Sequence, residues 1–92
     1  MPHVVKRLVI EGRVQGVGFR YALADEARAR GLGGWVRNRR NGDVEAIVAG
    51  LEEDIAALVA WAHHGPPAAK VTAVRVELAT GEFAGFDIAP TS

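Results

Sequence analysis

Apolar residues recur along the chain with two different spacings, and these spacings predict strands and helices. Residues 3–12 are rich in β-branched side chains, and apolar Leu8 and Ile10 alternate there with charged Arg7 and Glu11, as in a half-buried strand. Related patterns predict further strands over residues 35–40, 43–49 and 71–78 and a short closing strand over 86–88.

Two other segments have the spacing of an amphipathic α-helix. Phe19, Leu23 and Ala27 lie at i, i+4 and i+8, which predicts a helix over residues 19–30 that ends before Gly31. A second helix is predicted from the apolar positions Leu51, Ile55, Leu58, Val59 and Ala62. Acidic residues occupy the first turn of this second predicted helix, and His63 and His64 occupy its last turn, so both ends suit the helix dipole.

The dipeptide Asn41-Gly42 separates the two middle strands. Both residues tolerate positive φ, so the dipeptide predicts a two-residue hairpin with a type I′ turn. The resulting order is strand, helix, strand, strand, helix, strand. This βαββαβ order predicts an α+β, ferredoxin-like α/β sandwich with an antiparallel sheet and both helices on one face. We expect residues 1–92 to form a single domain.

Composition narrows the class of protein. Apolar residues make up 49% of the chain and charged residues 24%, as in globular proteins. Cysteine is absent, which excludes disulfides, thiolate metal sites and a thiol nucleophile. No apolar run approaches the roughly 18 residues of a membrane-spanning helix, so we expect a cytoplasmic protein without a membrane partner.

Charge is unevenly distributed although the net charge is zero. Residues 1–46 hold nine basic and five acidic residues, and residues 47–92 hold two basic and six acidic ones. The first half therefore carries +4 and the second half −4. Such asymmetry favours an anion-facing half, and a general scatter of charges over solvated faces is the alternative.

The glycine-rich loop over residues 12–18 is the first candidate site. It leads directly into the predicted helix at Phe19, where unpaired N–H groups and the positive end of the dipole favour an anion. Arg20 lies in the first turn, where the dipole disfavours a cation, and so its presence suggests that a bound anion compensates it. The loop lacks the Gly-Lys-Ser/Thr of a nucleotide-binding P-loop.

Asn38 is the second candidate. Asparagine is a poor strand residue, and alternation places Asn38 on the same face as Val36, toward the helices, where we expect its amide to be hydrogen-bonded. In this fold Asn38 can meet a ligand held by Arg20. The neighbouring Arg37, Arg39 and Arg40 either protect an exposed strand or add a positive field.

Two segments resemble the signatures of the acylphosphatase family. Residues 12–20 read Gly-Arg-Val-Gln-Gly-Val-Gly-Phe-Arg, similar to G-x-V-Q-G-V-x-F-R. Residues 34–45 read Gly-Trp-Val-Arg-Asn-Arg-Arg-Asn-Gly-Asp-Val-Glu, similar to G-W-V-x-N-x-x-x-G-x-V-E. Both fit without a gap, and the resemblance extends over essentially the whole chain.

The resemblance implies hydrolysis of a small acyl phosphate to a carboxylate and inorganic phosphate, without a metal or other cofactor. Arg20 would clamp the phosphate and Asn38 would orient the attacking water. The phosphate oxygens would be cradled by the loop formed by Gln15, Gly16, Val17, Gly18 and Phe19. We expect a monomer with no nucleic-acid partner.

Two binding functions compete with catalysis. RNA-recognition domains share this fold plan, but they display aromatic residues on two central strands, and residues 4–11 and 43–49 contain none. A docking domain that keeps the anion loop without turnover would resemble the first segment of hydrogenase-maturation carbamoyltransferases. Release of phosphate from an acyl phosphate separates these alternatives.

Overall fold

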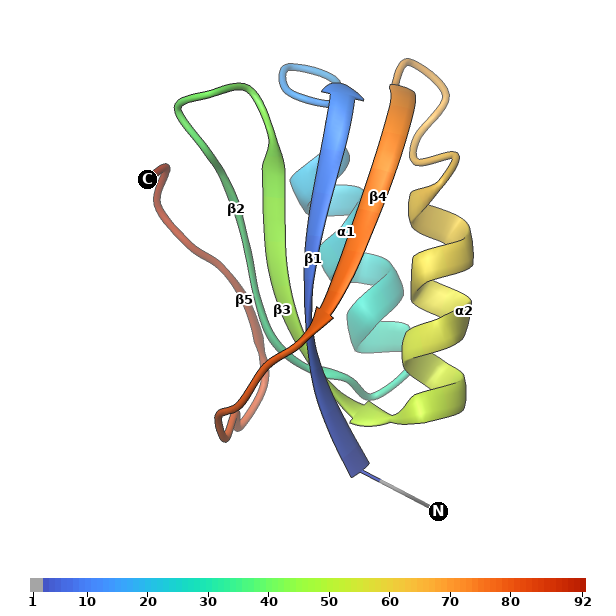
Figure 1. Ribbon diagram of the computed structural model, residues 1–92, viewed down its shortest axis with the longest axis vertical. Coiled ribbons are helices and arrows are strands. Elements are labelled where there is room, and N and C mark those ends of the chain that lie inside the picture. The colour runs from blue at the N-terminus through green and yellow to red at the C-terminus, as the bar shows by residue number, and fades with distance from the viewer. Residues whose placement is uncertain (1–2) are drawn as a thin grey trace.

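Two helices cover one face of a five-stranded sheet in the computed structural model, which describes residues 3–92 (Figure 1). The elements are β1 (His3–Arg13), α1 (Phe19–Ala29), β2 (Gly33–Asn38), β3 (Val44–Leu51), α2 (Glu52–Ala62), β4 (Lys70–Leu78) and β5 (Phe86–Ile88). The predicted ferredoxin-like α+β fold is confirmed.

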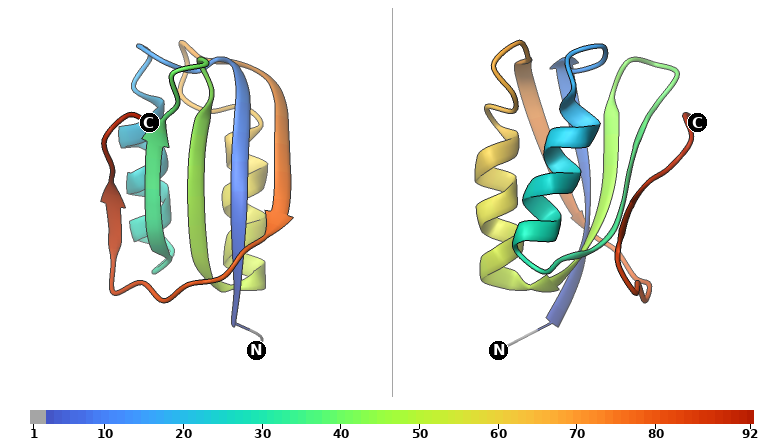
Figure 2. Two further views of the ribbon diagram at one scale, coloured as in Figure 1. Left: turned by 60° about the vertical axis from the view of Figure 1, so that its left-hand side comes forward. Right: turned by 180° about the vertical axis from the view of Figure 1, so that it is seen from behind.

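The sheet is mixed rather than antiparallel. Its strand order is β4-β1-β3-β2-β5, in which β1 pairs antiparallel with β3 and β4, β2 pairs antiparallel with β3, and β5 pairs parallel with β2. The prediction of an antiparallel sheet is wrong for β5 alone. After β4 the chain crosses the end of the sheet at which β2 begins, so β5 starts beside β2 and runs in the same direction (Figure 2).

The hydrophobic core lies between the helices and the sheet. The predicted helical stripe of Phe19, Leu23 and Ala27 is buried there, as are Leu8 and Ile10 from the central strand. Because alternate residues of a strand point to opposite faces, these core positions leave Arg7 and Val9 on the open face of the sheet. The fold thus separates the apolar core from an open face that carries both charged and apolar side chains.

The connection between β2 and β3 differs from the prediction. No non-glycine residue in the described part of the chain has a positive φ, so Asn41 does not adopt the type I′ conformation, whereas Gly42 has a φ of 102°. The Arg39 N–H donates to the Asp43 carbonyl (2.8 Å), and the Gly42 N–H donates to the Arg39 carbonyl (3.1 Å). This is a three-residue loop with a glycine bulge, which shifts the strand register by one residue from the expected one.

Candidate active site

The glycine-rich loop and the β2–β3 hairpin loop lie at the same end of the sheet (upper end of Figure 1). Gly16 and Gly18 have φ values of 72° and 79°, and a Cβ on either would meet no atom within 4 Å. The backbone conformation, and not crowding, therefore requires glycine here. Short segments with left-handed residues typically gather N–H groups into an anion-binding nest.

The start of α1 leaves backbone donors uncapped by side chains. Gly18 is the N-cap, no side chain caps the helix, and no acidic residue lies in its first turn. Val14 and Phe19 are buried at the two ends of the loop, and the Phe19 ring packs against Trp61 at a centroid distance of 5.5 Å. The loop is therefore anchored in the core, against which Val17 also packs, while Gly16 and Gly18 are exposed.

Arg20 extends from this first turn and is half-buried. Within residues 3–92, ion pairs involve Lys6, Arg7, Arg30, Arg37, Arg39 and Arg75, and Arg20 forms none. Its guanidinium carbon lies 5.9 Å from the centroid of the Tyr21 ring. The five N–H donors of Arg20 are thus not engaged by a carboxylate of the described chain.

Asn38 ends β2 on the core side of the sheet. It lies opposite Val44 in the register and on the same face as buried Val36. Its Oδ1 is buried and has no hydrogen-bond partner in the part of the chain that the structure describes. The expectation of a hydrogen-bonded amide therefore fails at this oxygen. An acceptor without a donor costs roughly 1–3 kcal/mol, and this oxygen is available to accept a hydrogen bond from a bound molecule.

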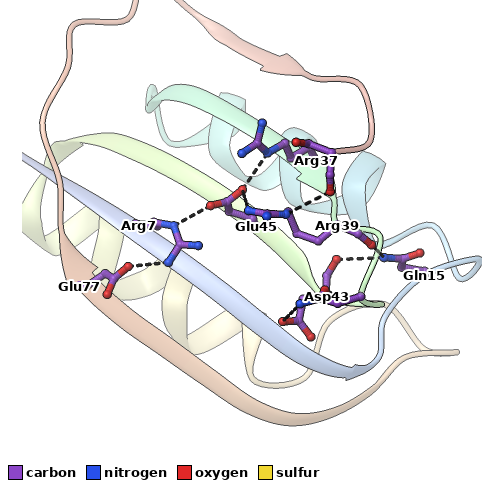
Figure 3. Close-up of polar contacts among 9 residues, drawn as sticks. Arg7, Gln15, Arg37, Arg39, Asp43, Glu45 and Glu77 are labelled. Carbon is purple, nitrogen blue, oxygen red and sulfur yellow. Dashed lines mark hydrogen bonds and ion pairs between the residues drawn. The ribbon is translucent and has the colours of Figure 1, made fainter.

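Gln15 connects the two loops. Its Nε2 donates to the backbone carbonyls of Arg39 (2.6 Å) and Asp43 (3.0 Å), as Figure 3 shows. Because Arg39 directly follows Asn38, these bonds hold the glycine-rich loop against the end of β2. The structure thus brings the loop over residues 15–20 and Asn38 to one place.

A cluster of three arginines around Glu45 on the open face of the sheet was not predicted. Glu45 is 4% exposed, and its carboxylate accepts hydrogen bonds from Arg7 Nε (2.6 Å), Arg37 Nε (2.7 Å) and Arg39 Nη1 (3.0 Å), as Figure 3 shows. Arg37 and Arg39 therefore pair with Glu45 on the open face of the sheet, although its single negative charge balances only one of the three guanidinium groups. A register based on the type I′ turn would have placed Arg37 opposite Ala46 and hidden this pairing.

Opposing influences set the pKa of Glu45. Burial raises the pKa of its carboxyl, but the hydrogen bonds from Arg37, Arg7 and Arg39 outweigh burial and lower the pKa from its usual 4.5 to about 2. The folded state therefore favours the ionised carboxylate more strongly than the unfolded chain does.

Acid should destabilise the protein in a window set by Glu45. A lowered pKa contributes stability that is complete above about pH 4.5 and is lost as the pH falls to about 2. We expect this contribution to be about 2–3 kcal/mol. Urea unfolding at pH 5.5, 4 and 2.5 measures the loss, and Glu45→Gln serves as the control because it removes this titration and leaves the other carboxyl groups of the chain in place. Parallel curves for the two proteins would show that Glu45 does not contribute.

The histidines take no part in this arrangement. His63 and His64 are exposed after the end of α2, as expected for residues at a helix terminus. Among residues 3–92, no group of three or more His, Cys, Asp or Glu side chains is placed to hold a metal ion. Within the same residues, no helix is both long and apolar enough to cross a membrane.

Comparisons with known proteins agree with the two signatures. The family model described as Acylphosphatase matches residues 6–88. An acylphosphatase of Cupriavidus necator is 56% identical over 85 residues, which are 92% of this chain and 92% of that protein. The structure of an acylphosphatase from Coxiella burnetii superposes with a TM-score of 0.92 at 33% identity, covering 95% of this chain and 93% of that one.

A longer protein also contains this fold. The crystal structure of full-length HypF, in a phosphate- and nucleotide-bound form, matches with a TM-score of 0.89 at 29% identity and covers 98% of this chain but 12% of that one. The family model and the curated relative nevertheless cover almost all of the described residues. By its signatures, its fold and these relatives, the chain belongs to the acylphosphatase family.

Proposed function

We propose that this acylphosphatase hydrolyses acyl phosphates by attack of an Asn38-oriented water on a phosphorus held by Arg20 and the loop over residues 15–20. In the reaction, water forms a bond to phosphorus, the bond between phosphorus and the bridging oxygen breaks, and a carboxylate and inorganic phosphate leave. The observation that carries the proposal is the buried, unpaired Asn38 Oδ1 beside the loop that Gln15 ties to its strand.

Binding of the phosphate depends on the start of α1. The uncapped N–H groups and the positive end of the helix dipole favour phosphate oxygens, and the left-handed glycines shape the loop around them. Arg20 adds a planar fork that donates to two phosphate oxygens at once. Because its donors engage no carboxylate of the described chain, Arg20 needs to break no ion pair to bind substrate.

Asn38 supplies an acceptor for the water. An unpaired Oδ1 accepts a hydrogen bond from one water hydrogen and thereby directs an oxygen lone pair toward phosphorus. The amide does not remove a proton in this scheme. The water proton passes to a phosphate oxygen as the new bond forms.

The chemistry of the leaving group explains why few side chains are needed to catalyse the hydrolysis. A carboxylate has a pKa of about 4, so it departs without a general acid. Phosphoryl transfer depends largely on positioning and electrostatic stabilisation, which Arg20, the loop donors and Asn38 supply. The substrate is thus a small acyl phosphate whose phosphate end is recognised.

Phosphate release tests the proposed activity. Purified protein is incubated with benzoyl phosphate in the presence of EDTA, and inorganic phosphate is measured against a sample without protein. We expect release well above the uncatalysed rate. Folded protein without release would favour the second candidate, a docking domain, which the likeness to a 12% segment of HypF supports.

We also propose that the protein acts as a cytoplasmic monomer without a nucleic-acid partner. Ion pairs of Arg7 with Glu77 and of Arg75 with Glu11 lie on the open sheet face, which makes that face unlike the apolar interface of a permanent dimer. Light scattering after size-exclusion chromatography is expected to give the chain mass of 9.8 kDa. Twice that mass would contradict a monomer.

A further inference from the structure

A continuous set of contacts joins the buried Glu45 to the candidate site. Glu45 Oε1 accepts from Arg39 Nη1, and the Arg39 Nε donates to the Ser92 carbonyl at 3.1 Å. The backbone of the same Arg39 donates to Asp43 and accepts from the Gln15 amide. Arg39 is therefore fixed through both its side chain and its backbone, and its carbonyl is one of the two that accept from Gln15 of the glycine-rich loop.

Glu45 is well suited to hold Arg39. Its side chain is 5% exposed, whereas the Arg39 side chain is 36% exposed. A long, partly solvated arginine loses much conformational freedom when it is fixed, and a charge-assisted bond to an immobile carboxylate offsets that loss. Glu45 is immobile because Arg7 from β1 and Arg37 from β2 hold it from two other directions.

We propose that Glu45 and Arg39 are positioning residues for hydrolysis. Together they fix the backbone carbonyls of Arg39 and Asp43. Because Gln15 donates to these two carbonyls, the glycine-rich loop is then held at the correct distance from Asn38. The inference rests on the proposed function, because Arg20 and the loop donors must hold phosphorus in line with the water on Asn38. A misplacement of about 1 Å at a reacting centre lowers turnover by up to about 10²-fold.

Two arginines offer a matched pair of variants. Arg39→Gln and Arg75→Gln each remove one guanidinium from an ion pair with a glutamate and change the net charge equally, but Arg75 pairs with Glu11 and does not contact Glu45. We expect Arg39→Gln to lower kcat for benzoyl phosphate about tenfold while the Kd for inorganic phosphate stays within about threefold. We expect Arg75→Gln to leave kcat within about twofold of the wild type, because exposed substitutions away from the site have small effects. Circular dichroism at the assay temperature checks that each protein is folded.

A double-mutant cycle separates positioning from general destabilisation. If Arg39 acts through Gln15, the double variant Arg39→Gln/Gln15→Ala has no lower kcat than the worse single variant. Multiplicative losses, or equal kcat values for Arg39→Gln and Arg75→Gln, would overturn the positioning role. If Arg39→Gln unfolds, Arg39→Lys replaces it under the same criteria, because lysine keeps the charge but lacks the Nε donor to Ser92.

The same assays distinguish an error in the proposed function from an error in the positioning role. A folded wild type that does not hydrolyse benzoyl phosphate contradicts the proposed function and removes the basis of the inference. An active wild type in which Arg39→Gln retains full turnover contradicts only the positioning role.

Discussion

Replacing Arg20 with lysine is expected to lower kcat/KM for benzoyl phosphate by about 10³-fold. Lysine keeps the positive charge but replaces a planar, two-pronged donor with a single ammonium group. The guanidinium can pair two phosphate oxygens and hold them as charge redistributes during transfer, and an ammonium at that point cannot do both. The loss of kcat/KM therefore reports the two-pronged geometry of the guanidinium rather than its positive charge.

Arg13→Lys is the matched control for this prediction. Arg13 ends β1 directly before the glycine-rich loop and is exposed, so it has the same chemistry near the same site. We expect its kcat/KM to stay within about twofold of the wild type, since exposed substitutions without fixed contacts have small effects. A loss of less than tenfold in Arg20→Lys would show that Arg20 is not the phosphate clamp.

Replacing Asn38 with alanine is expected to lower kcat by about 10²-fold. The variant loses the acceptor that orients water, while Arg20 and the loop donors still bind phosphate. The Kd for inorganic phosphate, measured by calorimetry, is therefore expected to stay within about threefold of the wild-type value. This separation of turnover from binding distinguishes the orientation of water from the binding of substrate.

Stability should move in the opposite direction from activity in Asn38→Ala. Because Oδ1 has no partner in the described chain, its removal leaves the free energy of unfolding unchanged or raises it by about 1 kcal/mol. Asn41→Ala is the control, since Asn41 lies on the same hairpin but is exposed and bonds only to Asp43. Unchanged turnover in Asn38→Ala would remove Asn38 from the mechanism.

The sequence predicted most of the fold because most elements have a clear period. The stripe of Phe19, Leu23 and Ala27 and the alternation around Leu8 and Ile10 identify elements whose apolar faces are buried as expected. The closing strand was located, but its direction was not, because three residues carry no information about which end of the sheet the chain returns to.

An error in the predicted turn of the hairpin also made the predicted pairing of the two strands wrong. Asn-Gly favours a two-residue turn, but the structure has a three-residue loop between the hydrogen-bonded residues Arg39 and Asp43. A change of one residue in register changes which side chains share a face, so the pairing of Arg37 with Glu45 could not be predicted. Tertiary bonds from Gln15 to both closing carbonyls accompany the wider loop, and no local pattern encodes those.

Charge asymmetry predicted the site only indirectly. The first half of the chain carries an excess of +4, but Arg7, Arg37 and Arg39 bind Glu45 on the open face of the sheet. Arg20, which forms no ion pair with the described residues, could be singled out from its place at a helix start where the dipole disfavours a cation. Helix electrostatics were therefore more informative here than net charge.

Hydrolysis in ¹⁸O-labelled water tests the central claim most directly. Benzoyl phosphate is turned over by the wild type, and the label is located in the products by mass spectrometry, with the uncatalysed reaction subtracted. Attack of the Asn38-oriented water on phosphorus predicts that the enzyme-dependent label appears in inorganic phosphate and not in benzoate. Label in benzoate would place the attack at the acyl carbon and contradict the proposed mechanism.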